Sequence, residues 1–319
     1  MTPFGFPSES YHCLLDEQPY YLVPQRLLPE VDPNQDLIVS PLCWFSWFGP
    51  LAPDKADRVA FAEYFCPSDW VVWVDDPATR ALWPYWAGVD YVPFLMNMQP
   101  GEPLAEEIPE NVRTVLCQAG VLVPPDYIEQ RRKQYLDLLW RCAPAFERGY
   151  VSIANLVPPF HVGALRRYYR FHVRSGAYTL GDEQVGRRYG VHNEVVARYI
   201  QYQLTNVISD IARTLVQPSY TYSVAYQSGA RLEPHTDREQ CEYSITLCFD
   251  SSPEPEAQSP WPIQLDTSDG SLRVWQYIGD ALIYRGRQLP HSRDTLPDGC
   301  ASSSLLLHYV DIDFDGPLN

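Results

Sequence analysis

Two histidines and one aspartate in the C-terminal half of the chain have the types and spacing of metal ligands. His235 and Asp237 flank Thr236, and His291 follows after a long interval. In an extended segment, residues i and i+2 point to the same side, so one strand end can present an imidazole and a carboxylate together. Two imidazoles and one carboxylate are the ligand set of non-haem iron sites that keep positions open for a co-substrate and oxygen. The alternative is a surface turn that binds no metal, because His-x-Asp is a common pattern.

Strand-like segments surround these three residues. From Tyr220 onward, apolar and polar residues alternate and turn residues separate the segments, which favours a sandwich, a barrel or a jelly roll. The interval between Asp237 and His291 fits about four strands that leave the first ligand pair and return beside it. The pattern predicts strands at Tyr220–Tyr226, Tyr243–Phe249, Ile263–Leu265, Leu272–Trp275, Ala281–Tyr284 and Ser303–Val310.

Helices and one strand should support this region. Tyr150–Ile153 reads as a strand and Val162–Val173 as a helix. The strongest helical pattern runs from Glu194 to Val216, with Asn193 as its N-cap, and should pack along the outside of the sheet.

The first part of the chain is rich in Pro and Trp and predicts a separate module. We expect a strand at Trp70–Val74, a short helix at Pro77–Trp86 and a helix at Pro109–Gly120. The last of these, with the following Val121–Val123, faintly resembles small winged-helix modules that bind leader peptides. A charged helix follows at Tyr127–Ala143. We interpret its cluster Arg131, Arg132 and Lys133 as a solvated face, with peptide docking as the alternative.

The predicted class is therefore α+β, with a β-rich core and flanking helices. The predicted division has three parts: residues 1–122 as an N-terminal module for substrate recognition, residues 123–145 as a helical linker, and residues 146–319 as the domain that carries the chemistry.

Composition excludes some partners. The chain has 319 residues, 45% of them hydrophobic, and a formal net charge of −16 at pH 7. A nucleic-acid partner is not expected, since such proteins usually carry a basic face. No apolar run approaches the roughly 20 residues of a membrane span. The eight cysteines form no CxxC pair, and Met1–Gly5 lacks the features of a signal peptide. We expect buried thiols and a reducing cytoplasm. The sequence predicts no oligomeric state.

A family resemblance rests on two ordered segments. Tyr226–Asp237 resembles the second strand and metal turn of prolyl-4-hydroxylase-like Fe(II)/2-oxoglutarate dioxygenases, in which a Tyr and a Gly turn precede His-x-Asp. Gly279–Tyr284, followed by Pro290-His291, resembles the strand that leads to their distal histidine. The resemblance covers roughly residues 146–312.

The resemblance implies a double-stranded β-helix with Fe(II) held by His235, Asp237 and His291. It implies 2-oxoglutarate and O₂ as co-substrates, with ascorbate as an optional reductant, and hydroxylation with formation of succinate and CO₂. By the same match, Tyr226 would hydrogen-bond a carboxylate of 2-oxoglutarate; its alternative is a core tyrosine.

One departure from the family pattern concerns the distal carboxylate of 2-oxoglutarate. The family places Lys or Arg about ten residues after the distal histidine, where this chain has Cys300–Ser304 and no basic residue. A buried carboxylate needs a partner. Either an arginine from elsewhere supplies the cation, or the co-substrate pocket is altered. The arginines near the motif are Arg293, Arg287, Arg285 and Arg231, and the hydroxyls that could assist them are Ser302 and Ser304.

Two functional hypotheses remain open. The first is an oxygenase acting on a peptide, a protein or an amino-acid-derived molecule. The second is a cupin-like metal-binding protein or an inactive oxygenase homologue that serves as a binding module. His308 could join the metal site, but its apolar strand favours a buried, hydrogen-bonded histidine.

Overall fold

The chain divides into two compact units in the computed structural model. The N-terminal unit comprises residues 1–137 and 158–168, and the C-terminal unit comprises residues 138–157 and 169–319. The structure describes residues 10–15, 32–49, 51–59, 70–104, 107–255 and 259–318. Met1–Gly5 and Cys66, which entered the localisation argument, lie outside these residues. The three-part division at residues 122/123 and 145/146 stays a prediction, as does the recognition role of the first part.

The N-terminal unit is built around a small antiparallel sheet in the order β2-β3-β4, and β1 pairs with β5. The bounds up to the start of the second unit are β1 Ile38–Val39, β2 Cys43–Phe45, the 3₁₀ helix η1 Ser46–Phe48, α1 Pro53–Ala56, β3 Val71–Asp75, β4 Leu82–Trp86, α2 Val92–Leu95, α3 Glu110–Gln118, β5 Leu122–Val123 and α4 Tyr127–Phe146.

Two expectations for this unit are wrong. The segment Pro77–Trp86 is not a helix, because Asp76 accepts hydrogen bonds from the backbone N–H groups of Ala78 and Thr79 and so closes a turn. The chain then forms the edge strand β4. Arg131 is not a solvated charge: it is buried and pairs with Asp76 at 2.6 Å.

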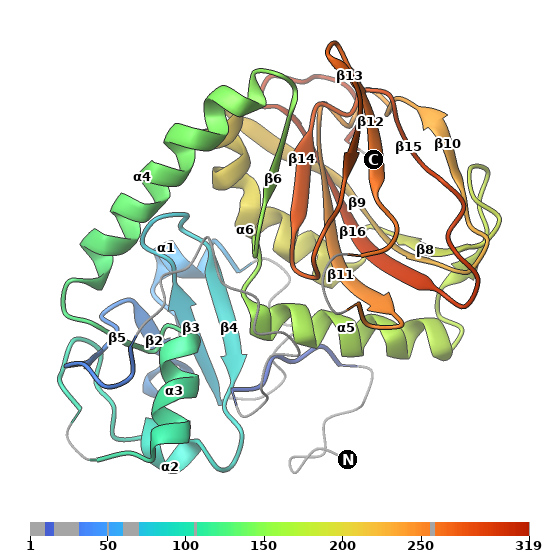
Figure 1. Cartoon of the computed structure of the whole chain (residues 1–319). Coiled ribbons are helices and arrows are strands. Elements are labelled where there is room, and N and C mark those ends of the chain that lie inside the picture. Colours follow the sequence, from blue (N-terminus) through green and yellow to red (C-terminus); the bar gives the residue numbers. More distant parts are fainter. Residues whose placement is uncertain are drawn as a thin grey trace. The chain divides into compact units, whose positions relative to one another are not determined.

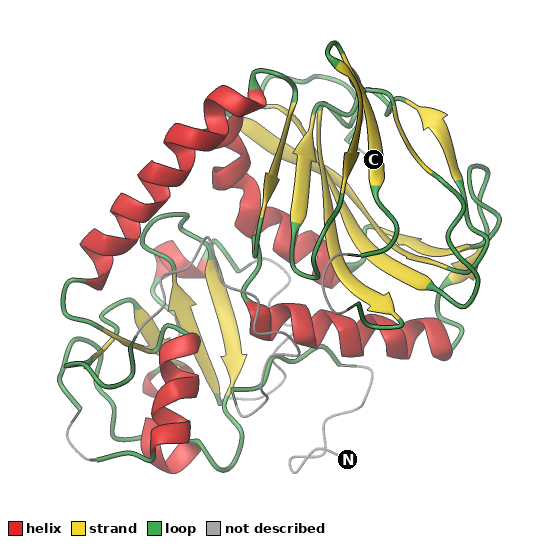
Figure 2. Ribbon diagram, in the orientation of Figure 1, coloured by secondary structure: helices red, strands yellow, loops and turns green. Residues whose placement is uncertain are grey.

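The C-terminal unit contains two antiparallel sheets, which Figure 1 labels by strand and Figure 2 colours by structure. The remaining bounds are β6 Tyr150–Ile153, α5 Pro159–Arg174, β7 Thr179–Leu180, β8 Arg188–His192, α6 Val195–Ala212, β9 Val216–Tyr226, β10 Leu232–His235, β11 Tyr243–Ser252, β12 Ile263–Thr267, β13 Gly270–Val274, β14 Ala281–Tyr284, β15 His291–Arg293 and β16 Ala301–Asp311.

The strand order of these sheets defines a double-stranded β-helix. The large sheet runs β6-β14-β11-β16-β9-β8-β7 and the small sheet β10-β15-β12-β13. The last eight strands of the chain divide between the sheets: β9, β11, β14 and β16 join the large sheet, and β10, β12, β13 and β15 the small one. The strands β11, β12, β13 and β14 form the predicted excursion between Asp237 and His291, and the predicted fold class is confirmed.

Apolar side chains fill the space between the two sheets. Ile263 and Leu265 of the small sheet pack with Leu282 and Tyr284 of the large sheet. Burial of such side chains stabilises the fold by about 1.5–3 kcal/mol each. This core holds β10 and β15, which carry the candidate ligands, against the large sheet.

Helix α6 packs along β9 of the large sheet, as its apolar spacing predicts. Its N-cap is Glu194 instead of Asn193: the Glu194 carboxylate accepts from the N–H groups of Val196 and Ala197. Asn193 instead accepts from the N–H of Thr221. The helix ends at Ala212, because Arg213 adopts a left-handed conformation with φ 56°.

Two further features concern the described helices and the described cysteines. No helix in the described ranges is long and apolar enough to cross a membrane. The seven cysteines that the structure describes are free, and six of them are buried.

Candidate metal and co-substrate site

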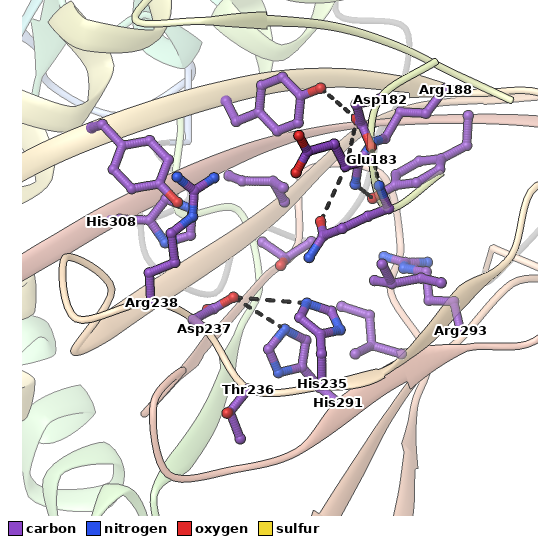
Figure 3. A pocket seen from close by; sticks show the side chains of 18 of the residues that line it. Asp182, Glu183, Arg188, His235, Thr236, Asp237, Arg238, His291, Arg293 and His308 are labelled. Atoms are coloured by element: carbon purple, nitrogen blue, oxygen red, sulfur yellow. Dashed lines mark hydrogen bonds and ion pairs between the residues drawn. The ribbon is translucent and has the colours of Figure 1, made fainter. Parts of the chain in front are cut away.

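The two sheet strands that carry the histidines are direct neighbours. β10 and β15 are antiparallel, and His235 and His291 are register partners. The Nε2 atoms of His235 and His291 lie 3.9 and 3.5 Å from Oδ1 of Asp237. Ligand atoms of all three residues lie within 4.8 Å of one another. Figure 3 shows the two rings and the carboxylate converging on one point.

Backbone carbonyls orient both imidazoles. Nδ1 of His235 lies 2.9 Å from the carbonyl oxygen of Glu233, and Nδ1 of His291 lies 3.0 Å from that of Leu289. A carbonyl only accepts, so each Nδ1 carries a proton, and in the neutral form of each ring the lone pair is on Nε2. Both lone pairs are therefore available on the side that faces Asp237, as metal ligation requires.

Asp237 is fixed by its backbone and by one of its two carboxylate oxygens. Its N–H donates to the carbonyl of Gly286 at 2.9 Å, and Ser244 donates to Oδ2 at 2.7 Å. A Cβ at Gly286 would overlap both Oδ2 and the Ser244 hydroxyl. Oδ2 is thus enclosed, and Oδ1 is the oxygen that faces the imidazoles.

The protonation of His291 suits a ligand. Burial lowers the pKa of His291, with a smaller opposing effect from Asp237, so the ring is neutral near pH 7. The Tyr284 hydroxyl lies 3.3 Å from Nε2 of His291. Thr246 offers the same hydroxyl a second hydrogen-bond partner. The neutral ring can therefore give its lone pair to a metal ion.

A cavity of about 530 Å³ opens beside the three ligands. This is a typical volume for a small-molecule site. It lies entirely within the C-terminal unit and is lined by both charged and aromatic side chains. Tyr226 and Arg293, two of the predicted co-substrate residues, line it.

Arg293 is a buried cation with no described countercharge. The residue is 5% exposed, and its Nη1 donates to the carbonyl of Trp261 at 2.6 Å. The guanidinium lies 4.5 Å from the centre of the Trp261 ring, which also packs edge-on against Tyr226. Burial lowers its pKa from the ordinary arginine value, with Tyr226 opposing that effect. No carboxylate among the described residues pairs with it, so a carboxylate ligand would supply the missing charge.

Arg188 is a second buried arginine on the same cavity, and no pattern in the sequence indicates it. It pairs with Asp182 at 2.5 Å and donates to the Tyr226 hydroxyl at 3.1 Å. Burial opposes its charge, but Tyr226 and Asp182 more than offset that effect and raise its pKa. Arg188 therefore already has a carboxylate partner, and it orients the hydroxyl of Tyr226.

The other candidate arginines lie away from the cavity lining. Arg287 is exposed and pairs with Glu242 at 3.1 Å. Arg285 lies 3.6 Å from the same carboxylate and over the ring of Tyr243. Arg231 is exposed beside Glu233. Each of the three has an acidic neighbour that already balances its charge, so none of them requires a carboxylate ligand.

Ser302 and Ser304 lie near Tyr226 but do not line the cavity. Ser302 is the register partner of Tyr226, and both serines are buried. The Ser304 hydroxyl oxygen is buried without a hydrogen-bond partner among the described residues. Their predicted contact with a co-substrate stays a prediction.

His308 is a buried, hydrogen-bonded histidine, as its strand suggests. It is 5% exposed, lines the cavity, and places Nδ1 3.0 Å from the Ser244 hydroxyl.

Sequence patterns gave no signal for Arg188, Asp182, Trp261 or Ser244. Their roles depend on pairing between distant strands and loops, and only the register of the sheet brings them to the cavity.

Comparisons with known proteins concern the fold alone. No family model and no curated protein matches this chain. Among solved structures, a Pseudomonas putida prolyl-4-hydroxylase is 16% identical, with a TM-score of 0.45 over 54% of this chain and 98% of its own. The α-ketoglutarate-dependent epimerase SnoN from nogalamycin biosynthesis is 12% identical, with a TM-score of 0.47 over 55% and 84%.

A prolyl hydroxylase from Trichoplax adhaerens, solved with a hypoxia-inducible-factor peptide, is 13% identical. Its TM-score is 0.46 over 55% of this chain and 90% of its own. The C-terminal unit itself has the strand order of a double-stranded β-helix, with two histidines and an aspartate at neighbouring strand ends. Each of these three solved structures matches little more than half of this chain.

Proposed function

We propose that this protein is a non-haem Fe(II)- and 2-oxoglutarate-dependent dioxygenase. The observation that carries the proposal is the convergence of two Nε2 lone pairs and one carboxylate oxygen at the edge of a cavity. Such a donor set would hold Fe(II) and leave positions open for a co-substrate and oxygen. His235, Asp237 and His291 would hold the iron.

Bound Fe(II) would supply the activation of O₂ that is coupled to oxidative decarboxylation of 2-oxoglutarate. The balanced reaction consumes a C–H bond of the substrate, 2-oxoglutarate and O₂, and yields the C–OH product, succinate and CO₂. One oxygen atom enters the product and the other enters succinate. The protein's own contribution is to bind and orient both organic reactants and to exclude water around them.

Arg293 and Tyr226 would bind the distal carboxylate of 2-oxoglutarate. Arg293 stands two residues after His291 on β15 and lines the same cavity, so one extended molecule could reach both. A guanidinium binds a carboxylate with two parallel hydrogen bonds. Arg188 would hold the Tyr226 hydroxyl in place as a second donor. This assignment explains how the chain functions without a basic residue at Cys300–Ser304.

Two further charged residues that line the cavity suggest the class of substrate. Arg238 directly follows the metal turn and lies 5.7 Å from the centre of the Tyr220 ring, and Glu183 reaches the cavity from the loop between β7 and β8. Figure 3 labels Arg238 beside Asp237, and Glu183 beside Asp182 and Arg188. No described residue forms an ion pair with either of them. One unpaired base and one unpaired acid fit an amino acid or a peptide, which carries both charges, and hydroxylation of such a substrate is the reaction that we favour.

The decisive test of the reaction is succinate formation. Protein loaded with Fe(II) should convert 2-oxoglutarate to succinate and CO₂ slowly without substrate and faster with it. His235→Ala and Asp237→Ala should abolish this conversion while far-ultraviolet circular dichroism stays unchanged. If the wild-type protein binds Fe(II) but neither binds nor consumes 2-oxoglutarate, the cupin-like or inactive binding module replaces the oxygenase proposal.

The substrate class can be tested with free L-amino acids and their capped forms. With Ni(II) in place of iron and 2-oxoglutarate bound, an L-amino acid should raise the melting temperature more than its N-acetyl amide. Glu183→Gln and Arg238→Gln should each reduce that difference. Equal shifts for free and capped forms would contradict the charged-substrate proposal and leave the reaction class intact.

Compartment and cofactors are linked in this proposal. Fe(II) and the buried free thiols are both stable in a reducing environment. We therefore propose a reducing compartment such as the cytoplasm. A cell fraction assay of the tagged protein would test it.

A further inference from the structure

Ser244 and His308 form a hydrogen-bonded chain that ends at the carboxylate of Asp237. Ser244 on β11 and His308 on β16 are register partners, and both are buried. The Ser244 oxygen lies 2.7 Å from Oδ2 of Asp237 and 3.0 Å from Nδ1 of His308. The chain thus runs from the large sheet to the carboxylate that faces the two metal-binding imidazoles.

The donors and acceptors of these two hydrogen bonds can be assigned in one way. The Asp237 carboxylate only accepts, so the single Ser244 proton points to Oδ2. The Ser244 oxygen must then accept at its other contact, and Nδ1 of His308 must be the donor. Burial lowers the pKa of His308 to about 4, so the ring is neutral and has one N–H. Nε2 is consequently the unprotonated nitrogen, in a ring that lines the cavity.

Close packing at Gly286 restricts the orientation of the carboxylate. A Cβ at Gly286 would overlap both Oδ2 of Asp237 and the Ser244 hydroxyl. The Asp237 N–H is bound to the Gly286 carbonyl. A rotation that turned the carboxylate out of its present plane would break the Ser244 bond and leave a buried serine hydroxyl without its acceptor.

We propose that Ser244 and His308 are positioning residues that lock Asp237 as a single-oxygen metal ligand through Oδ1. The pair also fixes His308 as the Nδ1–H tautomer and presents its Nε2 to the cavity as a hydrogen-bond acceptor for a substrate O–H or N–H. The inference rests on the proposed metal site, because Oδ1 has this role only when a metal binds there.

The first test measures the tautomer of His308 in the wild-type protein without any metal. Long-range ¹H–¹⁵N correlation spectra of histidine-labelled wild-type protein distinguish the two neutral tautomers by their nitrogen shifts. We expect an unprotonated Nε2 and a protonated Nδ1 at His308, assigned by its loss in His308→Asn. A protonated Nε2 would overturn the proposal.

The second test uses Co(II) as the probe, through its affinity and its visible absorption spectrum. Ser244→Ala should weaken Co(II) binding by roughly 10–100-fold, the range for loss of a partner behind a metal ligand. It should also change the spectrum, because the carboxylate can rotate. His308→Leu should act in the same direction and His308→Asn should restore the wild-type values, because the asparagine amide can still donate to Ser244. His192→Leu is the matched control, since His192 lines the cavity but stacks on Tyr222.

The outcomes separate this inference from the proposed function. If Asp237→Ala abolishes Co(II) binding while Ser244→Ala and His308→Leu match the wild type, the positioning role is wrong and the metal site stands. If Asp237→Ala also binds Co(II) as the wild type does, the metal site itself is wrong. Thermal unfolding of each variant confirms that the compared proteins are folded.

Discussion

Two buried arginines on one cavity differ in their countercharge. Arg188 is 3% exposed and has Asp182 at 2.5 Å. Arg293 is 5% exposed, contacts the carbonyl and the indole ring of Trp261, and has no carboxylate partner among the residues that the structure describes. An unpaired buried charge is costly, so a protein retains one where a ligand supplies the opposite charge. On this basis we propose that Arg188 belongs to the framework of the cavity and that Arg293 is the arginine that would bind the co-substrate.

Arg293→Met should give the largest effect. The distal carboxylate would lose its cation, and truncation of one partner of a buried charge pair costs about 2–5 kcal/mol of binding. The affinity of Ni(II)-loaded protein for 2-oxoglutarate should fall by the corresponding factor, roughly 30- to 5000-fold. Isothermal titration calorimetry measures it. Metal affinity should not change, and the free energy of unfolding without ligand should stay within about 1 kcal/mol of wild type.

Arg188→Met should lower the stability of the protein more than its affinity for 2-oxoglutarate. Asp182 and the Tyr226 hydroxyl would lose their donor, which should lower the free energy of unfolding by about 2 kcal/mol. Affinity for 2-oxoglutarate should fall by less than about tenfold, because only the orientation of Tyr226 changes. Urea denaturation and calorimetry on the same preparation provide both values. A loss of affinity as large as that of Arg293→Met would remove the distinction between the two arginines.

Buried histidines extend the comparison, because they avoid an unpaired charge by releasing the proton. Burial lowers the pKa of His308 to about 4 and that of His161, which bonds the Tyr11 hydroxyl, to about 3. The unfolded chain binds these protons near pH 6.5 and the folded protein does not. Stability is therefore complete above about pH 6.5 and falls below it, by about 2 kcal/mol per histidine at pH 5.

Urea denaturation at pH 7.5 and pH 5 should show this loss, and His308→Asn should remove its share. A stability that stays flat over this interval, or the same decrease in His308→Asn, would show that His308 is not buried as a neutral ring.

Arg287→Ala should have the smallest effect. Its guanidinium is exposed and pairs with Glu242 at 3.1 Å. Exposed ion pairs contribute about 0–1 kcal/mol. We expect an unfolding free energy within that range of wild type and unchanged affinity for 2-oxoglutarate. A large loss of co-substrate affinity would make Arg287 a candidate again for the cation that binds the distal carboxylate of 2-oxoglutarate.

The fold was predictable where local pattern and burial agree. Ala281–Tyr284 is a strand with the bounds that its sequence indicates, and the interval before His291 does contain the returning strands. Pro77–Trp86 was mispredicted because turn chemistry at Asp76 and pairing with β3 outweighed a helical pattern. Propensity is a weak guide where tertiary pairing decides.

The candidate site was predictable in part for a similar reason. His235, Asp237 and His291 can be recognised as candidates from their residue types, and His235 and Asp237 also from the two-residue spacing that places both on one side of a strand. Arg188 and Ser244 do not, because nothing in their neighbourhoods distinguishes them from ordinary strand residues. Their partners Asp182, Tyr226 and His308 come from the loop before β8 and from other strands of the large sheet. Such contacts follow from register, which a single sequence does not specify.

The most direct test compares two ligands that differ only at the distal end. 2-Oxoglutarate and 2-oxobutyrate share the 2-oxo acid group, but 2-oxobutyrate lacks the distal carboxylate. Wild-type protein loaded with Ni(II) should bind 2-oxoglutarate far more tightly, Arg188→Met should keep that preference, and Arg293→Met should lose it. A preference that survives in Arg293→Met and disappears in Arg188→Met would contradict the account.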